Sequence, residues 1–262
     1  MTIGYLVTEA ETIWLTSAEG GAVPGHVLAS DQETGFSLVQ ALGRLNTPSI
    51  DLGIGLRVGA GDRAIMAAEG GRRHAIAARV VARQEFAGYW EYVLDRAIFT
   101  APAHPFGAAP ALISADGRLI GIGSLHVQHA NGRELRRDVN MVVPIDLLPP
   151  ILDDMLTYGR PNRPARPWLG LYATEVEDAI IVAGLSERGP ASKSRIAAWR
   201  PHPRCARGSG GESRRSYGAR SGQPARRAAK WCYSSTRDND NLDGSGVLSV
   251  DRTQFLKAPK LH

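Results

Sequence analysis

An Asp-Gly dipeptide at residues 116–117 stands between two apolar segments, and this feature constrains the fold of the chain most. Asp-Gly between apolar runs is the strongest short-range signal for a β-hairpin. The hairpin follows a loop of small residues, 104–110, in which glycine and alanine let the backbone approach its neighbours closely. We therefore expect a loop, a strand, a tight turn and a second strand that ends near Gly123.

Short apolar segments recur between residues 13 and 144, each bounded by glycine, aspartate or asparagine. They are residues 13–16, 23–29, 36–42, 56–59, 63–68, 75–81 and 141–144. Strands at such regular spacing, without intervening helices, are typical of a β-barrel or sandwich. The sequence therefore predicts an all-β fold.

A helix and a linker follow the last of these strands. Apolar residues recur at helical spacing from Leu147 to Leu156, Asp146 stands where an N-cap is expected, and Gly159 stands where the helix should end. Residues 159–167 are too rich in proline for a helix or a central strand. They mark the clearest domain boundary in the sequence.

The positive net charge of the chain, +5, comes from one segment. Residues 195–237 hold 11 of the 31 basic residues and one of the 26 acidic ones, so the remainder has 20 basic residues against 25 acidic ones. This distribution argues against a nucleic-acid-binding protein. No run of about 20 apolar residues is present, so we expect no membrane span.

The loop and hairpin resemble the nucleophile loop and following hairpin of the HtrA/Deg family of trypsin-like serine proteases. In that family Asn-Pro-Gly-Asn-Ser-Gly-Gly-Pro-Leu precedes a strand, Asp-Gly and a strand ending in Gly-Ile. Residues 168–171, Trp-Leu-Gly-Leu, similarly resemble the opening of the family's PDZ domain, and Ile-Ile-Val-Ala at 180–183 and Gly-Pro-Ala at 189–191 resemble its continuation. The resemblance runs from residue 2 to about residue 193.

The resemblance implies a trypsin-like double β-barrel, then a helix, a linker and a partial PDZ domain. It divides the chain into a protease-fold domain (1–158), a linker (159–167), the start of a PDZ domain (168–193), an altered PDZ region (194–246) and a C-terminal tail (247–262). The chain begins at the strand that would carry the catalytic base. We therefore expect a first barrel that is truncated at its N-terminus and has an unpaired edge.

The resemblance places the three catalytic positions on residues that lack the required chemistry. The base falls on Tyr5, the acid on Gly35 and the nucleophile on Ala108, or on Gly107 if the match slips by one residue. Trypsin-like catalysis needs a hydroxyl, an imidazole to take its proton and a carboxylate to orient the imidazole. An ordinary tyrosine, with a pKa near 10, is a poor base at neutral pH. These substitutions predict a serine endopeptidase homologue that is inactive and requires no cofactor or metal.

Two alternatives remain open: an active serine endopeptidase that uses other residues, or a decayed gene copy of a protease. The side chains that offer the right chemistry elsewhere are His26, His74, His104, His126, His129, Ser114, Ser124 and Asp31. No Ser/His/Asp spacing signature accompanies them. His126 and His129 are spaced like a metal-binding pair, but no third ligand accompanies them and a solvated loop is favoured.

Residues 194–246 depart from the rest of the chain, because they lose hydrophobic periodicity and become rich in Arg, Ser, Gly and Ala. One interpretation is a disordered basic segment. The other is a pair of compensating frameshifts, in the gene or in its sequencing. Residues 194–203 and 216–232 permit codons whose shifted frames read AGLRPGDPIL and LWRALWAAGPPGGEVVL, as expected of a PDZ domain.

The resemblance also implies partners and a location. The PDZ-like opening predicts binding of polypeptides or protein C-termini through Leu169, Gly170 and Leu171, by addition of a strand. Relatives in this family are usually exported or periplasmic, although this chain shows no signal peptide, and an oligomer is possible.

Overall fold

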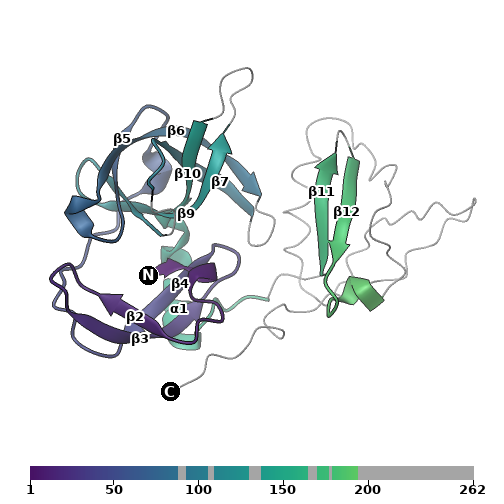
Figure 1. The fold of residues 1–262 in the computed structure, drawn as a ribbon, viewed down its shortest axis with the longest axis horizontal. Coiled ribbons are helices and arrows are strands. Elements are labelled where there is room, and N and C mark those ends of the chain that lie inside the picture. Colours follow the sequence, from purple (N-terminus) through teal and green to yellow (C-terminus); the bar gives the residue numbers. More distant parts are fainter. Residues whose placement is uncertain (88–92, 106–108, 130–136, 165–169, 177–178, 194–262) are drawn as a thin grey trace, which may run out of the picture. The chain divides into compact units, whose positions relative to one another are not determined.

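The computed structural model describes residues 1–193, apart from 88–92, 106–108, 130–136, 165–169 and 177–178. The chain divides into two units (Figure 1). The first contains Met1–Asn162, and the second begins at Arg163. Among the described residues, no helix is long and apolar enough to cross a membrane.

An open antiparallel sheet forms the first part of the first unit. It consists of β1 (Thr2–Ile3), β2 (Ile13–Thr16), β3 (Ala22–Ser30) and β4 (Phe36–Ala41), in the order β1-β4-β3-β2. The strands predicted at 13–16, 23–29 and 36–42 are therefore confirmed. Their turns contain Gly20 and Gly35, both with positive φ, which glycine adopts without steric cost.

A closed six-stranded barrel forms the second part of the first unit. Its strands are β5 (Arg63–Ala67), β6 (Ile76–Ala87), β7 (Val93–Ala101), β8 (Ala111–Ser114), β9 (Leu119–His129) and β10 (Arg137–Pro144), in the order β10-β7-β6-β5-β8-β9. The Asp-Gly turn joins β8 to β9, with Gly117 at a φ of 81°. The predicted hairpin and the all-β, two-barrel fold class are confirmed, with the first barrel open.

The strand predicted at residues 56–59 is wrong, because a 3₁₀ helix, η2 (Gly55–Arg57), occupies this position. Two tertiary contacts hold the turn. The Leu56 N–H donates to the carboxylate of Asp146 at 2.9 Å, and the backbone at Gly55 passes so close to the Ile120 carbonyl that a Cβ there would lie 2.2 Å from its oxygen. These contacts with Asp146 and Ile120 accompany the turn in place of the predicted strand pairing.

Helix α1 (Pro149–Tyr158) follows β10, with both prolines in its first turn, and ends at Gly159, whose φ is 72°. The prediction that Asp146 caps this helix is wrong. Asp146 lies in a 3₁₀ helix, η4 (Ile145–Leu147), and its carboxylate accepts from Leu56 instead. Leu148 takes the N-cap position and makes no side-chain capping bond.

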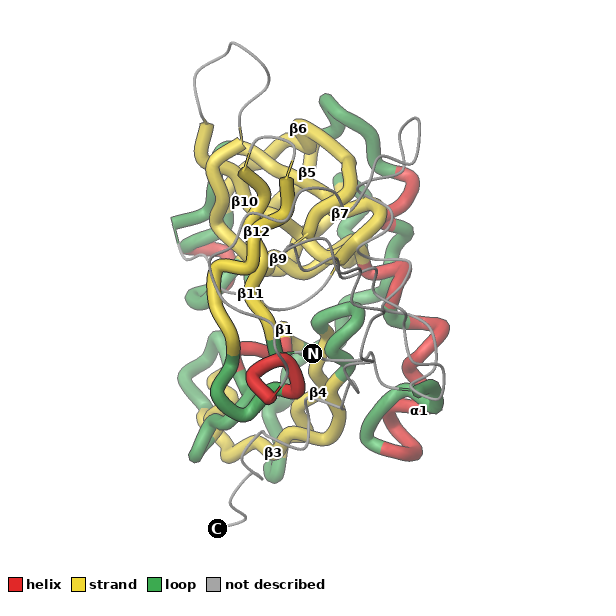
Figure 2. The backbone as a smooth tube through the Cα atoms, turned by 90° about the vertical axis from the view of Figure 1, so that its right-hand side faces the viewer, coloured by secondary structure: helices red, strands yellow, loops and turns green. Residues whose placement is uncertain are grey.

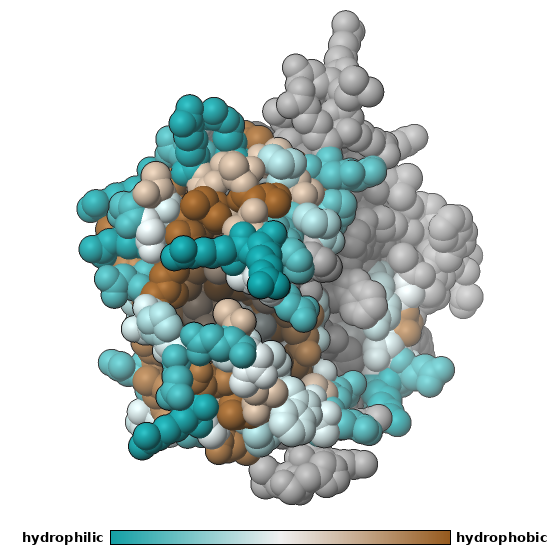
Figure 3. Space-filling view, turned by 60° about the vertical axis from the view of Figure 1, so that its left-hand side comes forward, coloured by the Kyte–Doolittle hydropathy of each residue, from teal (hydrophilic) through white to brown (hydrophobic). Residues whose placement is uncertain are grey.

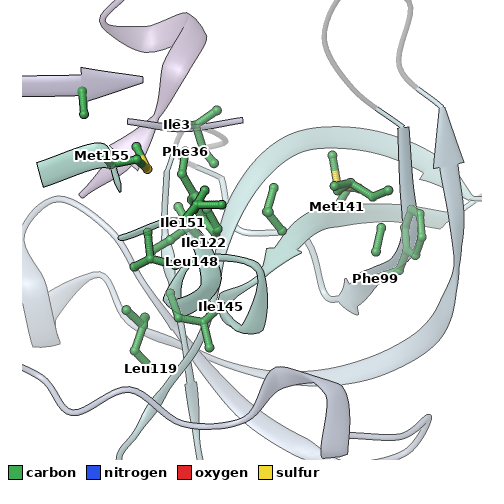
Figure 4. Close-up of a cluster of buried hydrophobic side chains, with 14 of the residues drawn as sticks. Ile3, Phe36, Phe99, Leu119, Ile122, Met141, Ile145, Leu148, Ile151 and Met155 are labelled. Carbon is green, nitrogen blue, oxygen red and sulfur yellow. The ribbon is translucent and has the colours of Figure 1, made fainter. Parts of the chain in front are cut away.

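One hydrophobic cluster joins the open sheet, the barrel and α1 (Figure 4). Its members are buried and come from segments far apart in the sequence: Ile3, Phe36, Leu119, Ile122, Met141, Ile145, Leu148, Ile151 and Met155 are among them. Figure 2 shows the barrel and the open sheet as two stacked groups of strands, with α1 beside the sheet. Burial of these side chains holds the two groups together.

The second unit contains a hairpin of β11 (Leu171–Val176) and β12 (Ala179–Leu185), followed by a 3₁₀ helix, η5 (Pro190–Lys193). The strand expected around residues 180–183 is therefore confirmed. The predictions for residues 194–246 and 247–262 lie outside the described residues.

Candidate functional site

Tyr5, at the predicted base position, lies in a 3₁₀ helix, η1 (Gly4–Leu6), directly after β1. Ile3, the residue before this turn, is fully buried in the hydrophobic cluster and anchors the turn. The Tyr5 ring is partly exposed, and its hydroxyl donates to the backbone carbonyl of Ser124 in β9. The side chain therefore spans from the open sheet to the barrel.

Ser124 lies at a bulge in β9. Met141 of β10 pairs with Leu125, and the next residue, Val142, pairs with Gly123, so the register of this ladder shifts at Ser124. A bulge locally changes the regular hydrogen bonding of a ladder. Ser124 itself is buried. The Tyr5 hydroxyl thus binds the backbone of β9 at its bulge.

Gly35, at the predicted acid position, lies next to the Tyr5 turn. Its carbonyl accepts from the N–H of Gly4 at 2.7 Å, and its own N–H donates to the Asp31 carbonyl at 2.9 Å. Its φ of 78° lies in the left-handed region, where a side chain is strained. The structure therefore brings the base and acid positions together, but Gly35 offers no carboxylate.

Ala108, at the predicted nucleophile position, and Gly107 lie outside the described residues. The loop is described again from Ala109, and the Pro110 carbonyl accepts from the N–H of Gly123 at 2.7 Å. A Cβ on Gly123 would lie 2.5 Å from the Pro110 ring, so the strand requires glycine there. Gly123 is the residue before Ser124, whose carbonyl binds Tyr5. The end of the loop, at Pro110, therefore binds β9 next to the Tyr5 contact.

His104, the histidine nearest the loop, is fully buried. Its backbone N–H donates to the Asn140 side-chain oxygen at 2.6 Å, and its imidazole Nε2 lies 2.6 Å from the His74 carbonyl oxygen. A carbonyl only accepts, so Nε2 carries a proton and donates it. The Asn140 side-chain nitrogen is buried and has no hydrogen-bond partner among the residues that the structure describes. No local sequence signal indicated Asn140, because only the barrel topology brings it to His104.

Asp31, the acid nearest Gly35 in the sequence, is buried in the turn between β3 and β4. One carboxylate oxygen accepts from the Thr34 N–H at 3.0 Å and the Thr34 hydroxyl at 2.8 Å. The other accepts from the Glu33 N–H at 3.3 Å. These bonds are typical of an aspartate that stabilises its own turn.

The remaining candidates lie on other elements of the first unit. Ser114 donates to Asp116 within the β8–β9 turn, His126 is exposed on β9, and His26 lies on β3. His74 ends a 3₁₀ helix, and its Nδ1 lies 2.8 Å from the Glu69 carbonyl oxygen. Within the described parts of the chain, no group of three His, Cys, Asp or Glu side chains is placed to hold a metal ion.

The predicted peptide-binding residues lie in the second unit. Leu169 is outside the described residues. Gly170 has a φ of 70°, and its carbonyl accepts from the Ser186 N–H at 2.7 Å. Leu171 begins β11 and pairs with Leu185 of β12. Gly170 therefore adopts a conformation that favours glycine immediately before the hairpin.

No family model and no curated protein matches the chain. Among solved structures, it is similar to the HtrA-type protease AlgW with a decapeptide, at 20% identity and a TM-score of 0.49. The match covers 75% of this chain and 63% of that one. The same protease with a tripeptide matches at 21% identity and a TM-score of 0.49, over 75% of this chain and 68% of that one.

Proposed function

We propose that the chain is an HtrA-like serine endopeptidase homologue that lacks proteolytic activity and binds polypeptides. One observation supports the proposed lack of proteolytic activity. At the base position the chain has a tyrosine whose hydroxyl donates its proton to the Ser124 carbonyl. A general base must accept a proton from the nucleophile, and a hydroxyl held as a donor is oriented for the opposite role.

The surroundings of Tyr5 support the same proposal. Gly35 lies beside the turn that carries Tyr5 and has no side chain to orient a base. The sequence also places alanine at the nucleophile position, Ala108. Hydrogen-bond donors of an oxyanion hole would by themselves leave about 10³-fold catalysis over water, which is far below a working protease.

The alternative function is an active endopeptidase that uses other residues, among which His104 and Asp31 lie nearest in the sequence to the nucleophile and acid positions. Two observations argue against it. His104 is fully buried and donates through Nε2 to the His74 carbonyl. Asp31 accepts three hydrogen bonds within its own turn. Neither group is presented to a substrate in these contacts. A decayed gene copy of a protease remains the other alternative and would lack activity as well.

Polypeptide binding is proposed for the segment around Gly170. A peptide that adds as a strand needs backbone donors and a close approach to its carboxylate, and Gly170, which has no Cβ, permits this approach at the start of β11. The groove also needs a second wall, which the resemblance places in residues 194–246. The chain as written should therefore bind apolar C-terminal peptides very weakly. With the reading frame repaired, it should bind them at micromolar affinity, about −8 kcal/mol.

Two measurements test these proposals. The purified chain is incubated with unfolded casein and, separately, with an active-site serine phosphonate. We expect neither cleavage above background nor labelling, and turnover that a serine-directed inhibitor abolishes would contradict the proposal. The chain as written and the frame-repaired chain are then titrated with a labelled peptide that ends in an apolar residue. Equal affinity of the two would contradict the assignment of residues 194–246 to a damaged PDZ domain.

A further inference from the structure

Two arginines lie opposite each other on the outer face of the closed barrel. Arg63 of β5 pairs with Arg79 of β6, and both are exposed, whereas the residues beside them, Ala64 and Ala78, are buried. Because side chains alternate between the two faces of a sheet, both guanidinium groups project outward. Like charges directly opposite each other destabilise an antiparallel pair. The stability of the chain therefore does not explain this pairing.

The register of β5 and β6 brings the two arginine side chains close together. Val80, the residue after Arg79, makes its backbone hydrogen bonds to the turn before β5. Its N–H donates to the Asp62 carbonyl at 2.9 Å, and its carbonyl accepts from the Gly61 N–H at 2.7 Å. Bonded and non-bonded positions alternate along an antiparallel pair, so Arg63 and Arg79 form a non-bonded pair. The Cα atoms of such a pair are about 4.5 Å apart, closer than those of a bonded pair.

No carboxylate neutralises the two arginines within the described part of the chain. Neither forms an ion pair there, and the one hydrogen bond of their guanidinium groups runs from the Arg79 Nη1 to the Gly61 carbonyl at 3.1 Å. The nearby carboxylates bind other groups: Asp62 accepts from a backbone N–H of its own turn at 2.8 Å, and Asp116 pairs with Arg118. A guanidinium presents several N–H donors in a planar fork that matches a carboxylate. Most of these donors have no partner within the described chain.

Apolar side chains form the next row on this face of the barrel. Ile65, two residues after Arg63, is 45% exposed. The register places Ala77 of β6 on one side of it and Ile113 of β8 on the other. Figure 3 brings forward the side of the first unit where β5 lies in Figure 1, and hydrophilic side chains lie against apolar ones there. A ligand that matches both rows needs an anionic group and an apolar group about 7 Å apart, the spacing of alternate residues in a strand.

We infer that this face binds an extended segment of another polypeptide, in which an acidic residue is followed two positions later by an apolar one. The carboxylate lies between the guanidinium groups of Arg63 and Arg79 and relieves their repulsion. The apolar side chain covers Ile65. A phosphate, whether free or in a nucleic acid, would use the arginines but leave Ile65 exposed. This site lies in the first unit and does not rest on the function proposed for the Gly170 segment.

The test titrates the full-length chain, labelled with nitrogen-15, with the peptide GSETISG blocked at both ends. Because the peptide has no free C-terminal carboxylate, its binding is distinct from C-terminal peptide capture around Gly170. We expect saturable shifts of the Arg63 and Arg79 Nε resonances, with an affinity that falls as salt rises. GSQTISG, which lacks the carboxylate, should bind at least tenfold more weakly. Equal affinity for the two peptides would overturn the proposed contact with the arginines.

Two further probes distinguish a polypeptide site from a general anion site. GSETSSG keeps the carboxylate but lacks the apolar residue, and it should bind at least threefold more weakly than GSETISG. Inorganic phosphate should shift the same arginine resonances only at concentrations at least tenfold higher. If either probe binds as tightly as GSETISG, the face does not recognise an apolar side chain and the inference is wrong.

Two matched substitutions test the location of the site. Arg63→Gln removes one of the two charges and should lower affinity for GSETISG about tenfold. Arg73→Gln is the control, because Arg73 is exposed in the 3₁₀ helix η3 (Gly71–Arg73), in the connection between β5 and β6. This variant should bind within twofold of the parent chain. Circular dichroism checks that both fold, and equal affinity of the two folded variants would contradict the assignment to Arg63 and Arg79.

The stability of Arg63→Gln without peptide distinguishes a binding role from a structural one. At low salt the variant should unfold at a higher temperature than the parent chain, because the substitution removes the repulsion between Arg63 and Arg79. The difference should shrink as salt rises. An unfolding temperature below that of the parent would show that the arginine pair stabilises the fold, and would overturn the inference.

Discussion

The hydroxyl of Tyr5 donates to the carbonyl oxygen of Ser124, a residue 119 positions away in the chain. This bond links the turn after β1, at the edge of the open sheet, to the bulge of β9 in the closed barrel. It is part of a wider contact between the two groups of strands, because Ile3 and Ile122 also share one buried cluster. The position that the family resemblance assigns to a catalytic base therefore has a structural role in this chain.

Tyr5→Phe should destabilise the first unit by about 1 kcal/mol, because the substitution removes the hydrogen bond from the Tyr5 hydroxyl to the Ser124 carbonyl. Tyr158→Phe is the matched control, since this tyrosine is 62% exposed at the end of α1, and its effect should stay within about 0.5 kcal/mol. Denaturant unfolding followed by tryptophan fluorescence measures both. A control variant as unstable as Tyr5→Phe would contradict this role.

Gly55→Ala should destabilise the first unit by about 1–3 kcal/mol, because a Cβ there would meet the Ile120 carbonyl oxygen at 2.2 Å and force the backbone apart. Gly59→Ala is the matched control. A Cβ at Gly59 meets nothing within 4 Å, and its stability should be close to that of the parent. Thermal unfolding of the two variants distinguishes a close backbone approach from a general cost of losing glycine.

Hydrogen bonds within the β8–β9 turn hold the pKa of Asp116 below its usual value. The Ser114 hydroxyl makes the largest contribution, the Asp116 backbone N–H the next, and Arg118 a smaller one. A carboxyl whose pKa is lowered by folding stabilises the protein above its unfolded pKa, about 3.9. That contribution is lost as the pH falls through the lower, folded pKa. Acid should therefore weaken this turn only below about pH 3.9.

Ser114→Ala should raise the pKa of Asp116 toward its unfolded value, because it removes the main hydrogen bond to the carboxylate. An NMR titration of the Asp116 carboxyl carbon measures this change. Arg118→Gln is the comparison, and its effect should be smaller, since the Arg118 Nε lies 3.5 Å from the carboxylate in an exposed pair. A larger shift in Arg118→Gln would contradict the assigned order of causes.

Ala108→Ser should not produce a protease. The substitution supplies a hydroxyl at the predicted nucleophile position, but Tyr5 donates its proton to Ser124 and Gly35 has no carboxylate. Without an imidazole to accept the serine proton, acylation lacks its general base. Casein cleavage by the variant should remain at the background of the parent chain. Cleavage by the single variant above this background would show that another residue acts as the base.

Local features of the fold follow from the sequence alone. Asp116-Gly117 forms the turn between β8 and β9, and Gly159 ends α1, because each uses a backbone conformation that its own residues favour. The strands β2, β3 and β4 likewise match their apolar segments. In these places the preference of a few neighbouring residues agrees with the final structure.

Tertiary structure decided the features that depend on distant partners. Leu56 was expected in a strand and Asp146 at a helix cap, yet the two bind each other across 90 positions. Asn140 contacts His104 because β10 closes the barrel, and Tyr5 contacts Ser124 at the bulge of β9. A polar group forms a hydrogen bond with whichever partner the packed chain brings within about 3 Å. The hydrophobic periodicity of the sequence does not indicate which distant residue that partner is.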